Sequence, residues 1–255
     1  MIINHNLPAV NTHRNMGLNN TAASKNMEKL SSGLRINRAA DDAAGLSISE
    51  KMRGQIRGLE QAQRNVQDGI SFAQTAEGAM NEVSSMLTRM KELNVQKENG
   101  TYSDSDKSNI NAELDQLGSQ IDAIMTNTNF NGINITDNVV VQADDSNFQI
   151  TITGVSTTGF SGLSSATNLS SVSDAITAVA KQRSNLGAVQ NRLEYTSNNL
   201  GTTVENLTAS ESRIRDTDMA KEMVALSKNN ILLQASQSML AQANSAPQGV
   251  LSLLR

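Results

Sequence analysis

The side chains that could carry out acid–base or metal chemistry are few and poorly placed for it. His5 and His13 lie in the N-terminal segment without an acidic residue at helical spacing. Asp41 and Asp42 are adjacent carboxylates with no histidine beside them, which is weak evidence for a metal site. We expect both to be solvated or paired with arginine. No zinc-protease, phosphate-loop or nucleophile-elbow motif occurs, so the sequence predicts no enzyme activity, no metal and no cofactor.

Composition excludes further classes of protein. The net charge of −4 over 255 residues leaves no basic stripe for nucleic acid. Without cysteine there are no disulfides and no zinc–thiolate sites. No apolar run is long enough to cross a membrane, and the N-terminus does not resemble a signal peptide. Aromatic residues make up only 2%, which favours thin seams between helices over a globular core.

A heptad pattern between Leu46 and Gln96 organises the chain. Apolar or small residues recur there at steps of four and three: Met52, Ile56, Leu59, Val66, Ile70, Ala73, Met80 and Leu87. No proline interrupts the pattern, so it predicts one helix over 46–96, roughly 75 Å long. Because such a rod exceeds a globular domain of this size, we expect an elongated molecule. A second apolar row, from Ala79 to Leu93, predicts an additional helical partner for the second half.

The next helix should return along the first. Asn99-Gly100 predicts a turn, and Ser103 with Asp106 predicts the cap of a helix over 105–127. A short connection between helices favours an antiparallel pair. This return places Arg89 and Glu113 at the same height, where we expect an exposed ion pair that contributes little to stability.

After this helical pair the pattern changes to strands. Alternating β-branched residues predict a β-hairpin over 139–153, and residues 154–171 form a low-complexity surface loop. The loop's hydroxyl side chains are predicted to face solvent and to be open to O-glycosylation, with an unmodified loop as the equal alternative: Ser156, Thr157, Thr158, Ser161, Ser164, Ser165 and Thr167. A third heptad helix follows over 172–214, with a capping box predicted at Ser171 and Asp174.

The two terminal segments lack local partners. Residues 1–32 form a weak helix, and residues 215–255 are apolar on several faces. The C-terminal apolar residues are predicted to form a polymerisation core: Met219, Met223, Leu226, Ile231, Leu233, Met239 and Leu240. Only the N-terminal segment and other copies of the chain remain to bury them. We therefore expect both termini to be disordered in the monomer and helical in a polymer.

Several segments resemble bacterial flagellin: Leu30–Leu46, Asn65–Gln96, Phe130–Ile135, Leu186–Leu200, Glu205–Met223 and Ile231–Arg255. The resemblance implies a mainly α fold, an elongated antiparallel helical bundle or coiled coil with a small β-hairpin. Its termini, 1–32 and 215–255, would pair as a helical hairpin in the filament core. A connecting spoke over 33–45 would lead to a rod over 46–214. The outer domains and the zinc-protease insertion of other family members are absent.

The resemblance also implies partners and a location. It implies an extracellular flagellar filament subunit, exported through the flagellar type III secretion channel without a cleaved signal. A chaperone would bind 215–255, and the filament cap and junction proteins would contact the polymer. Arg89, Leu93 and Glu113 match the residues that the animal innate immune flagellin receptor recognises, and would lie on one surface patch. The alternatives are a hook–filament junction protein and, less in keeping with the C-terminal helix, a cytoplasmic coiled-coil scaffold.

Overall fold

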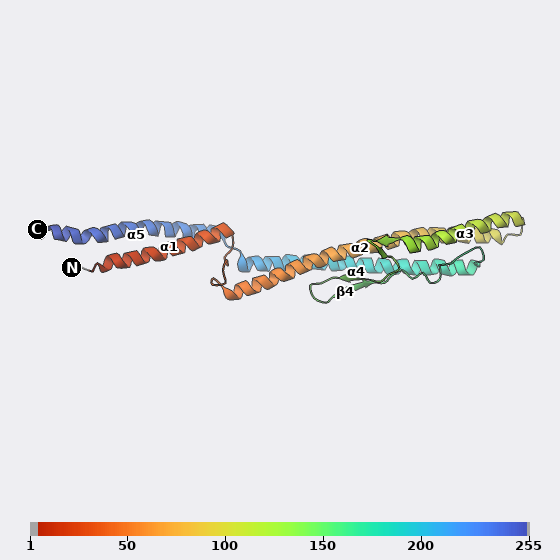
Figure 1. Cartoon of the computed structure of the whole chain (residues 1–255), viewed down its shortest axis with the longest axis horizontal. Helices are drawn as coiled ribbons and strands as arrows, with labels where there is room; N and C mark the ends of the chain where they lie inside the picture. Colours follow the sequence, from red (N-terminus) through yellow and green to blue (C-terminus); the bar gives the residue numbers. More distant parts are fainter. Residues whose placement is uncertain (1–4, 254–255) are drawn as a thin grey trace. The chain divides into compact units, whose positions relative to one another are not determined.

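The computed structural model describes residues 5–253, and within that range the chain is mainly helical (Figure 1). The elements follow in this order: α1 Leu7–Ser32, α2 Ala43–Lys97, α3 Asp104–Asn127, β1 Asn129–Phe130, β2 Ile133–Asn134, β3 Val139–Gln142, β4 Gln149–Ile152, α4 Leu169–Arg215 and α5 Met219–Leu253. The predicted mainly α fold with a small antiparallel hairpin is confirmed. The chain divides into a central unit, Gln55–Asn206, and a terminal unit made of the residues before and after it.

Helices α2 and α4 lie side by side in the central unit, as their heptads predict (Figure 1). Their seam residues Val66, Leu87 and Leu193 are completely buried. A polar pair interrupts the apolar seam, because Gln190 Nε2 of α4 donates to Glu77 Oε2 of α2 at 3.3 Å. Polar groups at seam positions of this kind hold two helices in one register.

The second apolar row of α2 is buried once α3 has returned along it. Val83 and Met90 of α2 are fully buried, and so are Leu114 and Ile121 of α3. The predicted capping box is present at the start of α3, where the side chain of Ser103 accepts the backbone N–H of residue 106. The sequence therefore predicted this helical pair correctly, including its cap.

The β3–β4 hairpin packs on α2 through a glycine. Its ladder runs antiparallel, with Val139 opposite Ile152, within the predicted range of 139–153. A Cβ at Gly69 of α2 would lie 2.8 Å from Cγ2 of Val141, so the strand approaches the helix where a side chain is missing. Ile150 and Ile152 of β4 are completely buried.

A second hairpin, β1–β2, was not predicted from the sequence. Phe130 pairs with Ile133, so only Asn131 and Gly132 connect the strands. Both have positive φ, 51° and 81°, which is the geometry of a tight primed turn. The Asn-Gly dipeptide between two apolar residues was the signal that could have revealed it.

Two predicted helix starts need correction. Helix α4 begins at Leu169, so Ser171 and Asp174 lie inside its first turns and the predicted capping box there is wrong. Helix α2 begins at Ala43, so it includes the last three residues of the predicted spoke. Its cap is Asp42, whose Oδ1 accepts the Gly45 N–H at 2.8 Å. A carboxylate is a strong N-cap because it satisfies free backbone donors in the first turn.

The terminal unit contains the helical hairpin of α1 and α5, which lie side by side and run in opposite directions (Figure 1). Helix α1 begins with a cap from Asn6, whose side chain accepts the Ala9 N–H, and ends at Gly33 in the left-handed conformation. No helix within residues 5–253 combines the length and apolar character that crossing a membrane requires.

Candidate assembly and recognition surfaces

The seam between α1 and α5 is half polar. On α1, the seam residues recur at steps of three and four, and small or apolar residues alternate with polar ones: Ala9, Thr12, Met16, Asn19, Ala23, Asn26 and Leu30. On α5, the half-buried residues follow the same spacing: Glu222, Leu226, Asn229, Leu233, Ser236, Leu240 and Ala243. Of these side chains only Ala9 and Ala23 are buried. Two small residues give the pair little apolar burial.

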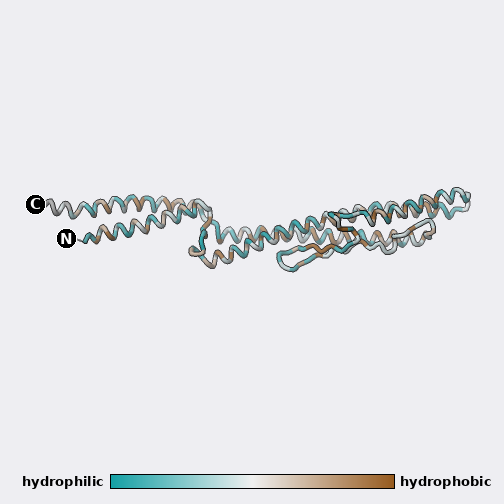
Figure 2. Tube along the Cα trace, in the orientation of Figure 1, coloured by the Kyte–Doolittle hydropathy of each residue, from teal (hydrophilic) through white to brown (hydrophobic). Residues whose placement is uncertain are grey.

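Ten other large apolar side chains in the described part of this pair lie outside the seam and are exposed. On α1 they are Leu7, Val10, Leu18 and Met27, each more than half exposed. On α5 they are Met219, Met223, Val224, Ile231, Leu232 and Met239. Three residues of this face, Met223, Val224 and Ile231, line a shallow hollow together with Ser227 and Lys228. Figure 2 shows hydrophobic segments recurring along both helices. A contiguous exposed apolar face is typical of a surface that other protein covers.

The predicted polymerisation core therefore lies on two faces of α5. Leu226, Leu233 and Leu240 are half-buried in the seam toward α1. The other four residues are exposed by 48–66%: Met219, Met223, Ile231 and Met239. The sequence pattern places Met219 and Met223 on the same face as these leucines, and Ile231 and Met239 on another. The structure divides the first of these faces, because its leucines are half-buried whereas Met219 and Met223 are exposed.

A short backbone ladder ties the end of α1 to the start of α5. The N–H of Arg35 donates to the carbonyl of Arg215 at 2.7 Å, and the N–H of Thr217 donates to the carbonyl of Gly33 at 3.0 Å. The guanidinium of Arg35 also donates to the Ile214 carbonyl. Because these bonds use backbone groups, no side-chain pattern in the sequence announced them.

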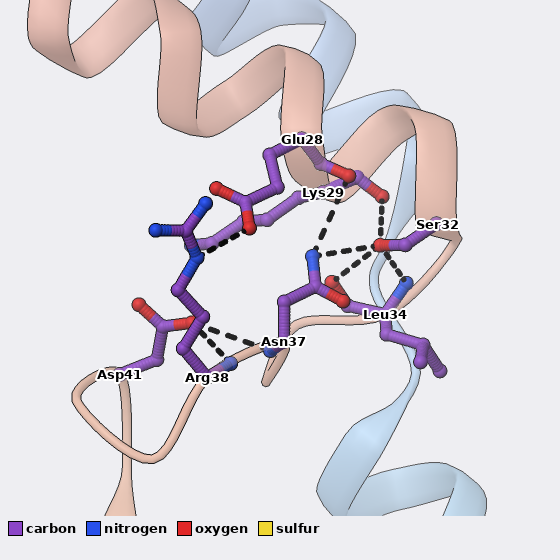
Figure 3. Close-up of polar contacts among 7 residues, drawn as sticks. All are labelled: Glu28, Lys29, Ser32, Leu34, Asn37, Arg38 and Asp41. Carbon is purple, nitrogen blue, oxygen red and sulfur yellow. Dashed lines mark hydrogen bonds and ion pairs between the residues drawn. The ribbon is translucent and has the colours of Figure 1, made fainter.

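The segment between α1 and α2 is a network of polar contacts (Figure 3). Asn37 Nδ2 donates to Ser32 Oγ at 2.8 Å, and Arg38 Nε donates to Glu28 Oε1 at 2.8 Å. Asp41 accepts the backbone N–H groups of residues 38 and 37, and these bonds lower the pKa of its carboxyl.

The expectation for Asp41 and Asp42 is therefore corrected. Asp41 is exposed, as expected, but both carboxylates bind backbone N–H groups rather than an arginine. Within residues 5–253, no cluster of three histidine or carboxylate side chains is arranged to hold a metal ion. His5 and His13 are both exposed.

The predicted pairing of Arg89 and Glu113 is present. Arg89 Nε donates to Glu113 Oε1 at 3.0 Å, and its Nη1 contacts Glu92 Oε2 at 3.3 Å. The hydrogen bond to Glu113 raises the pKa of Arg89, and all three side chains are about half exposed. The prediction that Leu93 lies on the same surface patch is wrong, because only 2% of it is exposed. Leu93 belongs to the second apolar row of α2, which packs inward.

The serine- and threonine-rich loop before α4 is held against α3. Asp122 accepts the Gly162 N–H, and Asp115 accepts the Ser165 N–H at 2.7 Å. Lys97 of α2 donates to the Ser165 carbonyl at 2.7 Å. Phe160, within the loop, is completely buried. Low complexity in the sequence therefore does not mean that this loop lacks anchors.

The predicted solvent exposure of the loop hydroxyls holds only in part. Ser156, Thr158 and Ser161 are exposed. The remaining four are half-buried: Thr157, Ser164, Ser165 and Thr167. The anchors on α3 draw the second half of the loop inward.

The fold and these surfaces define a helical structural protein whose terminal pair exposes the face that a partner would cover. Two family models match the chain. The "Bacterial flagellin N-terminal helical region" matches residues 3–141, and the "Bacterial flagellin C-terminal helical region" matches residues 169–254. The chain belongs to the bacterial flagellin family.

Known relatives are similar to this chain over their whole length. "Flagellin" of Halalkalibacterium halodurans is 54% identical over 272 residues, and "Flagellar filament 33 kDa core protein" of Treponema phagedenis is 46% identical over 286 residues. Both matches cover all of each chain. The crystal structure of Bacillus cereus flagellin matches 58% of this chain and 94% of its own, at 28% identity and a TM-score of 0.49.

Family membership identifies the chain as a structural component of the extracellular flagellar filament. It favours this function over the hook–filament junction protein and the cytoplasmic scaffold.

Proposed function

We propose that the chain polymerises with its own copies, which cover the exposed apolar faces of α1 and α5. The observation that carries this proposal is the placement of large apolar side chains outside the α1–α5 seam, with Ile231 66% and Met239 62% exposed. Burying one such side chain contributes roughly 1.5–3 kcal/mol, which becomes available only when a neighbour arrives.

Polymerisation can be tested by replacing Ile231 and Met239 with serine. Both side chains are exposed in the single chain, so the double variant should retain the helical content and central-unit stability of the unchanged protein. It should fail to form filaments in a sedimentation assay. Val95→Ser is the control, because Val95 is also exposed, at 55%, but lies in the central unit. Filaments formed equally by all three proteins would reject the proposal.

The same sparse burial supports terminal segments that order on assembly. Three buried apolar residues, Ala9, Ala23 and Ile36, are the whole apolar core in the described part of the terminal unit. Ordering each backbone residue costs about 1–2 kcal/mol, which so little burial does not offset. We expect protease to remove both termini from monomers and to spare them in filaments. A segment that stays unfolded before assembly could be held by a chaperone at 215–255 and could pass through the type III secretion channel. The exposed apolar faces could also bind the filament cap and junction proteins.

For the monomer, we propose recognition by the innate immune flagellin receptor through Arg89 and Glu113. The half-exposed guanidinium has a planar fork that suits carboxylates or carbonyls of a partner. Arg89→Ala should weaken receptor binding at least about tenfold and leave the fold intact. The receptor affinity of Arg89→Lys should lie between those of the unchanged protein and Arg89→Ala, since lysine keeps the charge and loses the planar fork. Leu93 acts in this proposal only by packing α2 against its neighbours.

O-glycosylation is proposed for the three exposed loop hydroxyls, Ser156, Thr158 and Ser161. Their exposure is the observation that supports it. An intact mass equal to that of the bare chain would reject it.

A further inference from the structure

The seam between α1 and α5 contains a row of polar side chains that the proposed polymerisation does not explain. Asn19 Nδ2 donates to Ser236 Oγ at 3.5 Å. The amide of Asn26, in the orientation that satisfies both of its atoms, donates to Glu222 Oε1 at 3.0 Å and accepts from Asn229 Nδ2 at 3.1 Å. We call these five residues the polar row.

The polar row follows a strict repeat. Asn19 and Asn26 are seven residues apart on α1, and Glu222, Asn229 and Ser236 are each seven apart on α5. A seven-residue spacing keeps side chains on one line of the helix surface, facing the partner. Every member of the row is half-buried. Such positions usually hold apolar residues in a coiled coil, so the row weakens the pair.

What the row provides in return is discrimination between partners. When the helices slide by three or four residues, Asn19 comes opposite Leu233 or Leu240 of α5 and loses its hydrogen bond to Ser236. A polar group left without a partner at a seam is costly, whereas leucine would pack in several alignments. The need for discrimination is high here, because the exposed face of α5 offers Met223, Ile231 and Met239 to any apolar neighbour.

We infer that the polar row makes α1 the partner of α5 in a single register, which leaves the exposed face of α5 for other copies of the chain. The row thereby separates the contact within a chain from the contacts between chains. This inference rests on the proposed polymerisation and adds the residues that determine its specificity.

The chain offers a closely matched pair of variants. Asn19→Leu with Asn229→Leu removes two members of the row. Asn20→Leu with Asn230→Leu makes the same chemical change one residue further along each helix, at exposed positions. Both double variants have identical composition, so they differ only in which face carries the leucines.

The register can be read by a cysteine pair, because the chain contains no cysteine of its own. Asn6→Cys and Ala243→Cys place the two cysteines at positions that are in contact, since Asn6 Nδ2 donates to the Ala243 carbonyl. The pair is introduced into the unchanged chain and into both double variants. Filaments are oxidised, and crosslinks within and between chains are separated on a non-reducing gel.

In the unchanged chain and the exposed-face variant, we expect the crosslink to form mainly within one chain. In the polar-row variant, the within-chain fraction should fall severalfold, with uncrosslinked chains or crosslinked dimers in its place. Equal fractions in the two double variants would overturn the inference. If the unchanged chain forms no filaments, the proposed polymerisation fails. A within-chain crosslink that still forms in the unpolymerised chain and falls only in the polar-row variant then supports the role of the row in the register, and an equal or absent crosslink there overturns it.

Discussion

Heptad spacing occurs in both units, yet the central and terminal units place different residues at the seam. In the central unit, seam residues such as Val66, Leu87 and Leu193 are fully buried. In the terminal unit, small and polar residues alternate with apolar ones at the seam, and seam leucines such as Leu233 remain half exposed. Other large apolar side chains of α5, such as Ile231, lie outside the seam. The comparison shows that the central unit contains its own apolar core, whereas the terminal unit buries few apolar side chains and leaves large ones exposed.

The largest expected effect contrasts one leucine from each seam. Leu193→Ala in the central unit should reduce the free energy of unfolding by about 2–5 kcal/mol, because it leaves a cavity in a closed core. Leu233→Ala should change the stability of the monomer far less, since that site is half exposed. Urea unfolding of both monomers, followed by circular dichroism, measures the difference. Equal losses would contradict the contrast between the units.

A second contrast lies within the central unit and concerns glycines in helices. A Cβ at Gly118 of α3 would collide with the Leu163 carbonyl of the anchored loop. Gly118→Ala should therefore destabilise the protein by about 1–3 kcal/mol. Gly78 of α2 has no atom near the position of a Cβ, so Gly78→Ala should stabilise by about 0.5–1 kcal/mol through helix propensity. Thermal unfolding of both variants tests whether the loop is fixed on α3.

Helix caps give a smaller effect that differs between the units. Ser103→Ala removes the capping box of α3 and should lower the unfolding free energy of the central unit by about 1 kcal/mol. Asn6→Ala removes the cap of α1 and its bond to Ala243. Its effect should be confined to the terminal helices. Amide hydrogen exchange distinguishes an effect on the central unit from an effect on the terminal helices. Faster exchange of central-unit amides in Asn6→Ala would argue against separate units.

The smallest effect concerns pH and the turn after α1. Backbone donors from residues 38 and 37 lower the pKa of Asp41 from its ordinary value of 3.8. A depressed pKa in the folded state contributes stability above the unfolded pKa, and this contribution is lost as pH falls through the folded value. The turn should therefore be insensitive to pH above about 5 and loosen below the ordinary aspartate pKa. In Asp41→Asn the turn should already be loosened at neutral pH. Faster amide exchange at residues 37 and 38 would measure this effect.

The sequence by itself determined the helices, the antiparallel return and the family. Heptad spacing over 46–96 and 105–127 indicates which residues face a partner, and caps such as Ser103 mark where a helix begins. These signals are local, because they depend on spacing within one segment. The resemblance in the terminal regions then indicated a flagellin, and the family models confirm it.

Only the tertiary structure decided which partner each face meets. The sequence put Met219 and Leu226 on one face of α5, and the structure half-buries Leu226 toward α1 and leaves Met219 exposed. Leu93 was expected on the surface and is buried. The loop at 154–168 is anchored because its backbone N–H groups donate to the carboxylates of Asp115 and Asp122. Every residue type except proline carries that donor, so no side-chain pattern predicts where such a segment will bind.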